Sequence, residues 1–113
     1  MSCVLSFQLD SLLSKELYKD VLVRLVHGKD LTLNYFELKS ENVDIPSHEH
    51  PVEHLVVVLD GNIEFIFNKQ NILVKKNGCL FVPARKRHAA RVIESPVKAL
   101  EIYNAIENEY YNR

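Results

Sequence analysis

Four of the five histidines in this sequence fall in two short stretches. His48, His50 and His54 lie close together, and His88 follows five positions after Pro83. His48 and His50 are two residues apart, so on an extended strand their imidazoles leave the same face. Neutral imidazole is the commonest protein ligand for divalent first-row metals. If one sheet brings these strand ends together, the four side chains can meet at one metal ion.

The other chemistry that the residues could support is sparse. His27 precedes Gly28 at the expected end of a strand and has no partner nearby in the sequence, so we leave it out of the site. No Ser-His-Asp arrangement and no glycine-rich phosphate loop accompanies the histidines. We therefore predict one divalent transition metal, and imidazole ligands suit Zn, Ni, Fe, Mn or Cu.

Short apolar segments separated by turn residues make up the rest of the chain. Turns are expected at Asp60-Gly61 and Ser95-Pro96, among other places. Residues 10–18 favour a short N-terminal helix, since a capping residue begins them and three leucines share a face. The predicted strands are residues 4–9, 21–26, 31–39, 45–50, 53–59, 62–68, 71–75, 80–82, 89–93 and 97–103. Short strands at this spacing indicate an all-β sandwich or barrel.

Length and composition favour one ordinary domain over residues 1–113. The chain is 47% hydrophobic and 26% charged, which is enough apolar material for a core beneath a normal polar surface. A net charge of −1 gives no reason to expect nucleic acid or a membrane as a partner. The two cysteines form no pairing pattern, and the N-terminus lacks the features of a signal peptide. We expect a cytoplasmic protein.

The first histidine stretch resembles the first sequence motif of the cupins. That motif runs Gly, five residues, His-x-His, three or four residues, Glu, six residues, Gly. In this chain the corresponding positions are Asn42, His48, His50, His54 and Gly61, with the spacing kept throughout. Asparagine in place of the first glycine is a mild change, because Asn tolerates positive φ better than most residues.

The second stretch resembles the second cupin motif, which carries a Gly, a Pro and a His five residues after the Pro. Asn77 or Gly78, then Pro83 and His88, fill those positions. Arg85 stands where the motif often has Gly. The two motifs and the strand pattern cover most of the chain. The resemblance implies the cupin double-stranded β-helix, a jelly-roll barrel with the histidines pointing inward.

His54 stands where the cupin motif has its glutamate ligand. The neighbouring Glu53 is a carboxylate, but successive side chains of a strand point to opposite faces. We therefore assign His54 as the ligand and expect Glu53 to face outward. With His48, His50 and His88 it would leave a divalent ion at formal charge +2, where three histidines and a glutamate leave +1. Such a centre is the stronger Lewis acid and favours an anionic, chelating small molecule.

The sequence is similar in particular to the small pectin-degradation cupins, which convert unsaturated monouronates into linear keto sugars. Their last strand carries Asp-x-Phe and an Arg four residues after the Phe. The matching positions are Glu101, Tyr103 and Glu107. The resemblance implies that Glu101 serves as an acid or base and that Tyr103 forms an aromatic wall. At the position of the carboxylate-binding arginine this chain has Glu107, which carries the opposite charge. This difference argues against uronate activity but does not affect the expected fold.

Three functional classes stay open on these residues. The first is a metal-assisted isomerase or tautomerase of a small keto, enol or sugar-acid-like compound. The second is a metal-dependent dioxygenase of a dicarbonyl or enediol, and the third is a ligand-binding cupin without activity. A homodimer is expected, because residues 4–9 and the outward side chains Leu55, Val57 and Leu59 offer more apolar surface than a lone small barrel leaves exposed.

Overall fold

The computed structural model describes residues 3–104, which form antiparallel strands joined by turns. The elements are a 3-10 helix η1 (Leu9–Ser11) and the strands β1 (Lys15–Tyr18), β2 (Val21–His27), β3 (Leu31–Leu38), β4 (Asp44–His48), β5 (His54–Ile66), β6 (Asn71–Val74), β7 (Cys79–Val82) and β8 (His88–Asn104). The all-β prediction is therefore confirmed. Within the described part of the chain, no helix has the length and apolar character needed to cross a membrane.

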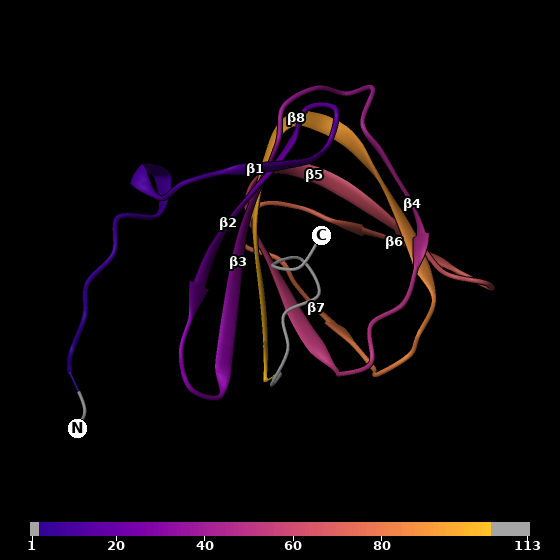
Figure 1. The fold of residues 1–113 in the computed structure, drawn as a ribbon. Coiled ribbons are helices and arrows are strands. Elements are labelled where there is room, and N and C mark those ends of the chain that lie inside the picture. The colour runs from indigo at the N-terminus through magenta and orange to yellow at the C-terminus, as the bar shows by residue number, and fades with distance from the viewer. Residues whose placement is uncertain (1–2, 105–113) are drawn as a thin grey trace.

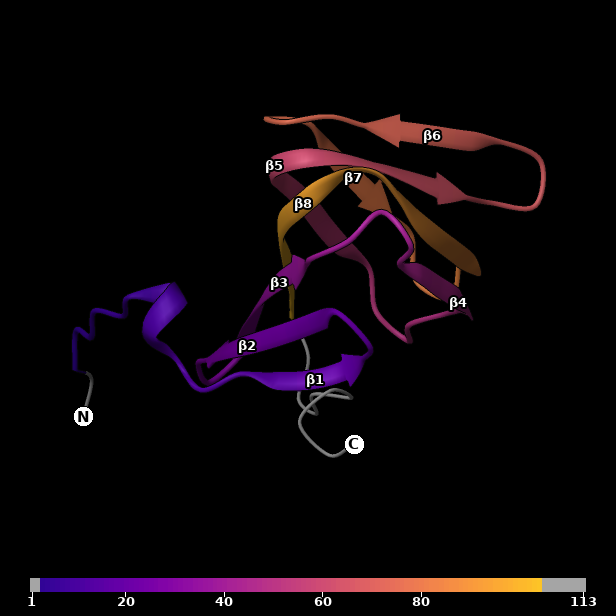
Figure 2. The same ribbon diagram turned by 90° about the horizontal axis from the view of Figure 1, so that it is seen from above.

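The strands β5 and β8 build the barrel because each is long enough to belong to two layers (Figure 1). The first half of β5 pairs with the second half of β8, with β7 and β3 on either side. The second half of β5 pairs with the first half of β8, with β6 and β4 on either side. A large layer in the order β1-β2-β3-β8-β5-β7 thus faces a smaller layer in the order β4-β8-β5-β6 (Figure 2).

The turns predicted at Asp60-Gly61 and Ser95-Pro96 are wrong, since both dipeptides lie inside continuous strands. Gly61 has a φ of 75°, and the register between β5 and β8 shifts on both sides of it. A Cβ at Gly61 would lie 2.3 Å from the carbonyl oxygen of Pro96. The bends of the two long strands therefore sit directly against each other. Turn-forming residues here mark a bulge that carries a strand from one layer into the next.

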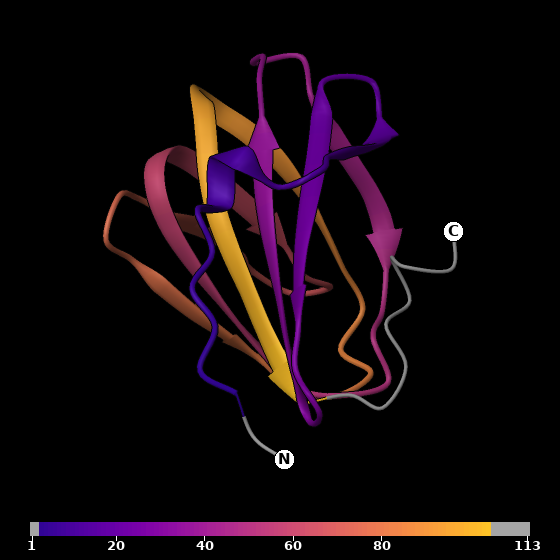
Figure 3. The same ribbon diagram turned by 60° about the vertical axis from the view of Figure 1, so that its left-hand side comes forward.

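The N-terminal predictions are also wrong. Residues 4–9 form no strand, and in place of a helix over residues 10–18 the chain has η1 followed by β1. Pairing of β1 with β2 overrides the helical pattern of the leucines. The Nε atom of Arg24 donates a hydrogen bond to the carbonyl oxygen of Leu12 at 3.0 Å. Beyond that contact the N-terminal segment extends from the outer side of the large layer (Figure 3).

The inward face of the strands is polar at one end of the barrel and apolar at the other. Along each strand, inward side chains alternate with outward ones, so successive inward-facing residues are two positions apart in the sequence. The inward positions run Thr32, Asn34, Phe36, Leu38 on β3; Tyr103, Glu101, Ala99, Val97 on β8; His54, Val56, Val58 on β5; and His88, Ala90, Val92 at the start of β8. This switch in polarity separates a polar site from the hydrocarbon core.

Candidate metal centre

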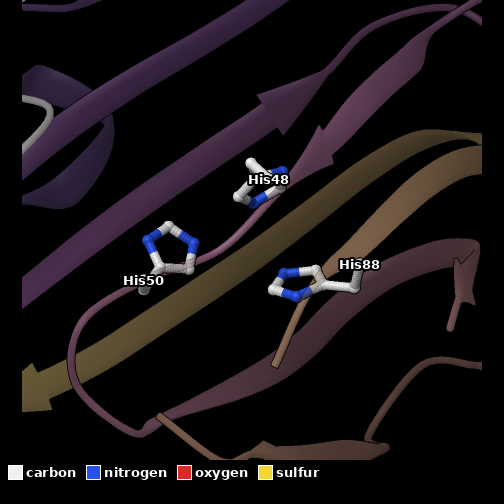
Figure 4. A group of neighbouring side chains, drawn as sticks. All are labelled: His48, His50 and His88. Carbon is white, nitrogen blue, oxygen red and sulfur yellow. The ribbon is translucent and has the colours of Figure 1, made fainter. Parts of the chain in front are cut away.

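All four predicted ligands lie at the polar end of the barrel. His48 ends β4, His54 begins β5 and His88 begins β8, while His50 lies in the loop between β4 and β5. His48 is directly opposite His88 in the β4–β8 pair, with ring centroids 4.5 Å apart. The centroids of His50 and His54 are 4.6 Å apart, and each is 5.7 Å from that of His88. Figure 4 shows His48, His50 and His88 turned toward a common space.

Backbone carbonyls orient two of these rings. The Nδ1 atom of His48 lies 2.9 Å from the carbonyl oxygen of Pro46, and that of His88 lies 2.7 Å from the carbonyl oxygen of Lys86. A carbonyl oxygen only accepts, so each Nδ1 carries the proton and donates it. In the neutral ring Nε2 then keeps its lone pair, as metal-ligating histidines in proteins do.

His54 is the most informative of the four because it is buried without a partner. The residue is 3% exposed, and neither ring nitrogen makes a hydrogen bond. Burial is the main cause that lowers the pKa of His54 to about 4, and the nearby charge of His88 lowers it further. The backbone of Val52 acts in the opposite direction, although its contact with the ring falls short of hydrogen-bond geometry. A buried polar group without a partner is costly, and a metal ion at Nε2 would satisfy it. At neutral pH the ring is in its neutral, ligating form.

The carboxylate of Glu101 joins the histidines. Its Oε2 atom lies 3.7 Å from Nε2 of His54 and 3.8 Å from Nε2 of His50, too far for hydrogen bonds. Potential ligand atoms of His48, His50 and His88 lie within 4.8 Å of one another, and so do those of His50, His54 and Glu101. Ligand atoms around one ion with bonds of about 2 Å are roughly 3–4 Å apart. These buried groups could therefore hold a metal ion after a small contraction.

Asn34 is the site residue that the sequence analysis missed. Its Nδ2 atom donates to Oε1 of Glu101 and to the hydroxyl of Tyr103, both at 3.2 Å. The side chain is fully buried on β3, and its Oδ1 atom has no partner. Asn34 therefore ties the two predicted catalytic residues together and leaves Oε2 of Glu101 for the histidines. A signal was present, because a polar side chain at an inward position of a predicted strand is unusual.

Tyr103 is the third member of this hydrogen-bonded group. Burial, partly offset by the hydrogen bond from Asn34, raises the pKa of Tyr103 to about 12. The phenol therefore keeps its proton at neutral pH. Two other glutamates named from the sequence are not part of this group. Glu53 is exposed on the outer side of the chain, and Glu107 lies outside the described residues.

A cavity of about 70 Å³ adjoins the histidines inside the barrel. His48, His54, His88 and Glu101 form its polar side, and the remainder of its wall comes from aliphatic and aromatic side chains of both layers, Tyr18 among them. The arrangement can bind a metal ion at its polar side and hold a small molecule against it.

Comparison with known proteins agrees with this geometry. Residues 34–103 match the family model described as "Cupin domain". No significant match is found among curated proteins. Among solved structures, KdgF from Halomonas sp. superposes with a TM-score of 0.84 at 12% identity, over 96% of this chain and 99% of that one.

Two further structures have the same fold. An RmlC-like cupin from Shewanella frigidimarina gives a TM-score of 0.81 at 13% identity, over 97% of this chain and 96% of that one. The polyketide cyclase RemF from Streptomyces resistomycificus gives 0.79 at 17% identity, over 95% of this chain and 82% of that one. At these identities the likeness establishes the fold alone.

Proposed function

Because this chain belongs to the cupin family, we propose that it is a metal-dependent enzyme acting on a small keto or enol compound. Nε2 atoms of His48, His50, His54 and His88 would hold one divalent transition metal. The observation that carries the proposal is the convergence of these rings, with Nδ1 of His48 and His88 bound to carbonyl oxygens and the ring of His54 buried without a partner. When bound, the ion would supply a Lewis acid that polarises a carbonyl oxygen.

Glu101 is the proposed base. Asn34 holds its Oε1 atom, so Oε2 faces the space beside His50 and His54 where a chelated substrate would lie. Oε2 takes a proton from the carbon next to the carbonyl group, and the electron pair of that C–H bond forms a C=C bond while the carbonyl oxygen takes the negative charge. Return of the proton to a different atom of the enolate completes an isomerisation. Atoms and electrons balance without a co-reactant.

The charge of the site supports an enolate ligand. Four neutral imidazoles leave a divalent ion at +2, and the Glu101 carboxylate beside them reduces the total to +1. Once Glu101 has taken the proton the site returns to +2, and an enolate with a second oxygen would chelate the ion and lower this charge to +1. The protonated hydroxyl of Tyr103 is the proposed donor on the same side.

Proton exchange tests this function directly. Purified protein loaded with metal is incubated with acetylacetone or hydroxyacetone in D₂O, and deuterium incorporation next to the carbonyl is followed by NMR. We expect exchange with the wild type and loss of exchange in Glu101→Gln, with metal content unchanged in both. Oxygen uptake without exchange would instead identify a dioxygenase. Full metal occupancy with neither exchange nor oxygen uptake would favour a ligand-binding protein.

A further inference from the structure

The cavity beside the candidate metal centre has a composition that selects a ligand. Fourteen residues line it, of which four are His48, His54, His88 and Glu101. The other ten are aliphatic or aromatic, and among the residues that the structure describes no lysine or arginine reaches the cavity. A ligand carrying a second anionic group, such as a sugar acid, would bury that charge without a cation, which is strongly unfavourable.

On both long strands the polar and the apolar residues that line the cavity are neighbours on the inward face, two positions apart in the sequence. On β8, Ala99 lies two residues from Glu101, and on β5, Val56 lies two residues from His54. Two residues of a strand span roughly 6.6 Å. A ligand that chelates a metal at the histidines would therefore place its next few atoms against hydrocarbon.

On this geometry, which rests on the proposed function, we infer that the site selects small amphipathic carbonyl compounds. The ligand has two oxygens at one end, and a short unbranched apolar group at the other. A space of about 70 Å³ has room for about two to three groups the size of a water molecule, so the apolar part has about two or three carbon atoms. Leu17 and Ile45, half-buried on β1 and β4, close the apolar side together with Phe36.

Hydroxamates with tails of increasing length test the inference in the Zn²⁺-loaded protein. Their common head chelates the metal, and the tail samples the cavity. Isothermal titration calorimetry should show affinity rising about fourfold for each added methylene from acetohydroxamate to butyrohydroxamate, and no further rise with hexanohydroxamate. Succinic monohydroxamate, whose tail ends in a carboxylate, should bind more weakly than butyrohydroxamate.

A cation placed in the cavity wall should reverse this preference. Leu17 belongs to the edge strand β1, so Leu17→Arg is expected to fold. In this variant we expect succinic monohydroxamate to bind more tightly than butyrohydroxamate. Leu13→Arg is the matched control, since Leu13 is exposed and lies outside the cavity, and it should keep the wild-type order.

The outcomes separate this inference from the proposed function. Equal affinity for all tails, or tighter binding of the carboxylate-ended tail by the wild type, would overturn the amphipathic ligand and leave the metal centre standing. The proposed function requires that the bound metal has coordination positions open to a ligand. If acetohydroxamate does not bind a chain shown to hold one Zn²⁺, both that requirement and this inference are wrong. The tail series needs no variant, so misfolding of Leu17→Arg cannot obscure it.

Discussion

His54 decides the charge of the candidate metal centre. Its ring is buried and makes no hydrogen bond, so a bound metal would satisfy a ring nitrogen that has no hydrogen-bond partner in the structure. We expect His54→Ala to weaken metal binding by more than the roughly 10- to 100-fold that loss of a supporting hydrogen bond costs. The barrel should still fold, because its apolar core lies beyond the site. Metal analysis and metal titration of the purified variant measure the effect.

Two neighbouring variants control this prediction. Glu53→Ala should leave metal content near that of the wild type, since Glu53 is exposed. His54→Glu restores the usual cupin ligand, so it should keep the metal while lowering affinity for an enolate-like ligand. An empty site in Glu53→Ala and a full site in His54→Ala would mean that the strand register assigned here is wrong by one residue.

Asn34 holds the orientation of Glu101. Asn34→Ala removes the donor to both Glu101 and Tyr103, and leaves a buried carboxylate oxygen without that bond. We expect a loss of about 1–3 kcal/mol in the free energy of unfolding, together with loss of proton exchange. Tyr103→Phe is the milder comparison, because the bond from Asn34 to Glu101 remains; its cost should be about 1 kcal/mol. Equal effects of both variants in urea unfolding and exchange would contradict this ordering.

At the scale of the element, the bends in β5 and β8 hold the two layers together. Gly61 has positive φ, and a side chain there would meet the carbonyl oxygens of Pro96 and Glu94 at 2.3 and 2.6 Å. Because these are backbone atoms, the neighbouring strand must move to admit a methyl group. We expect Gly61→Ala to cost at least about 2 kcal/mol in the free energy of unfolding.

Gly28→Ala is the matched control for this strand bend. Its nearest contact would be the carbonyl oxygen of Leu31 at 3.6 Å, an ordinary van der Waals distance. The change should stay within about 0.5 kcal/mol of the wild type. Comparable losses for both variants in chemical unfolding would show that any side chain at a glycine of this barrel is harmful, and that the paired bends have no special role.

For the whole molecule, stability of the metal-free protein should fall as the pH drops from about 6.5 to about 4. Burial lowers the pKa of His54 from 6.5 to about 4, and burial lowers that of His88 as well. In this window the unfolded chain binds a proton at His54 that the folded chain excludes, so acid favours unfolding. The loss from His54 is on the order of 3 kcal/mol across the window.

Urea unfolding of chelator-treated protein above, within and below this window measures the pH effect. His54→Gln carries no titrating ring at that position, so its stability should depend less steeply on pH. A variant with the same pH profile as the wild type would assign the acid sensitivity to other groups.

The outer surface of the large layer leads us to expect a homodimer. Leu55 is 41% exposed and Phe81 54% exposed, side by side on β5 and β7, and Val4 and Leu5 on the N-terminal segment are exposed too. Sedimentation should give about twice the 13.1 kDa of one chain. Leu55→Glu should shift the mass toward one chain, whereas Leu73→Glu, equally exposed on β6, should not. A monomeric wild type at micromolar concentration would exclude this assembly.

Much of the fold followed from local pattern. Strands such as β2 and β3 were predicted nearly to the residue, because short apolar segments bounded by turn residues are marked by the local sequence itself. The four histidines were found in the same way, since their spacing from Gly61 and Pro83 belongs to the chain and not to its packing. Glu101 and Tyr103 were reached only through the likeness of the last strand to a known family.

The remainder depended on contacts between distant residues. The same turn-forming dipeptides can end a strand or bend it, and only the pairing of β5 with β8 makes Asp60-Gly61 a bulge. The leucines before β1 carry a helical pattern, but the strand partner that overrides it is supplied by β2. Asn34 belongs to the site because β3 lies beside β8, a neighbour 67 residues away along the chain. Side-chain pattern is local information, whereas the strand partners and the cavity wall exist only once the barrel has closed.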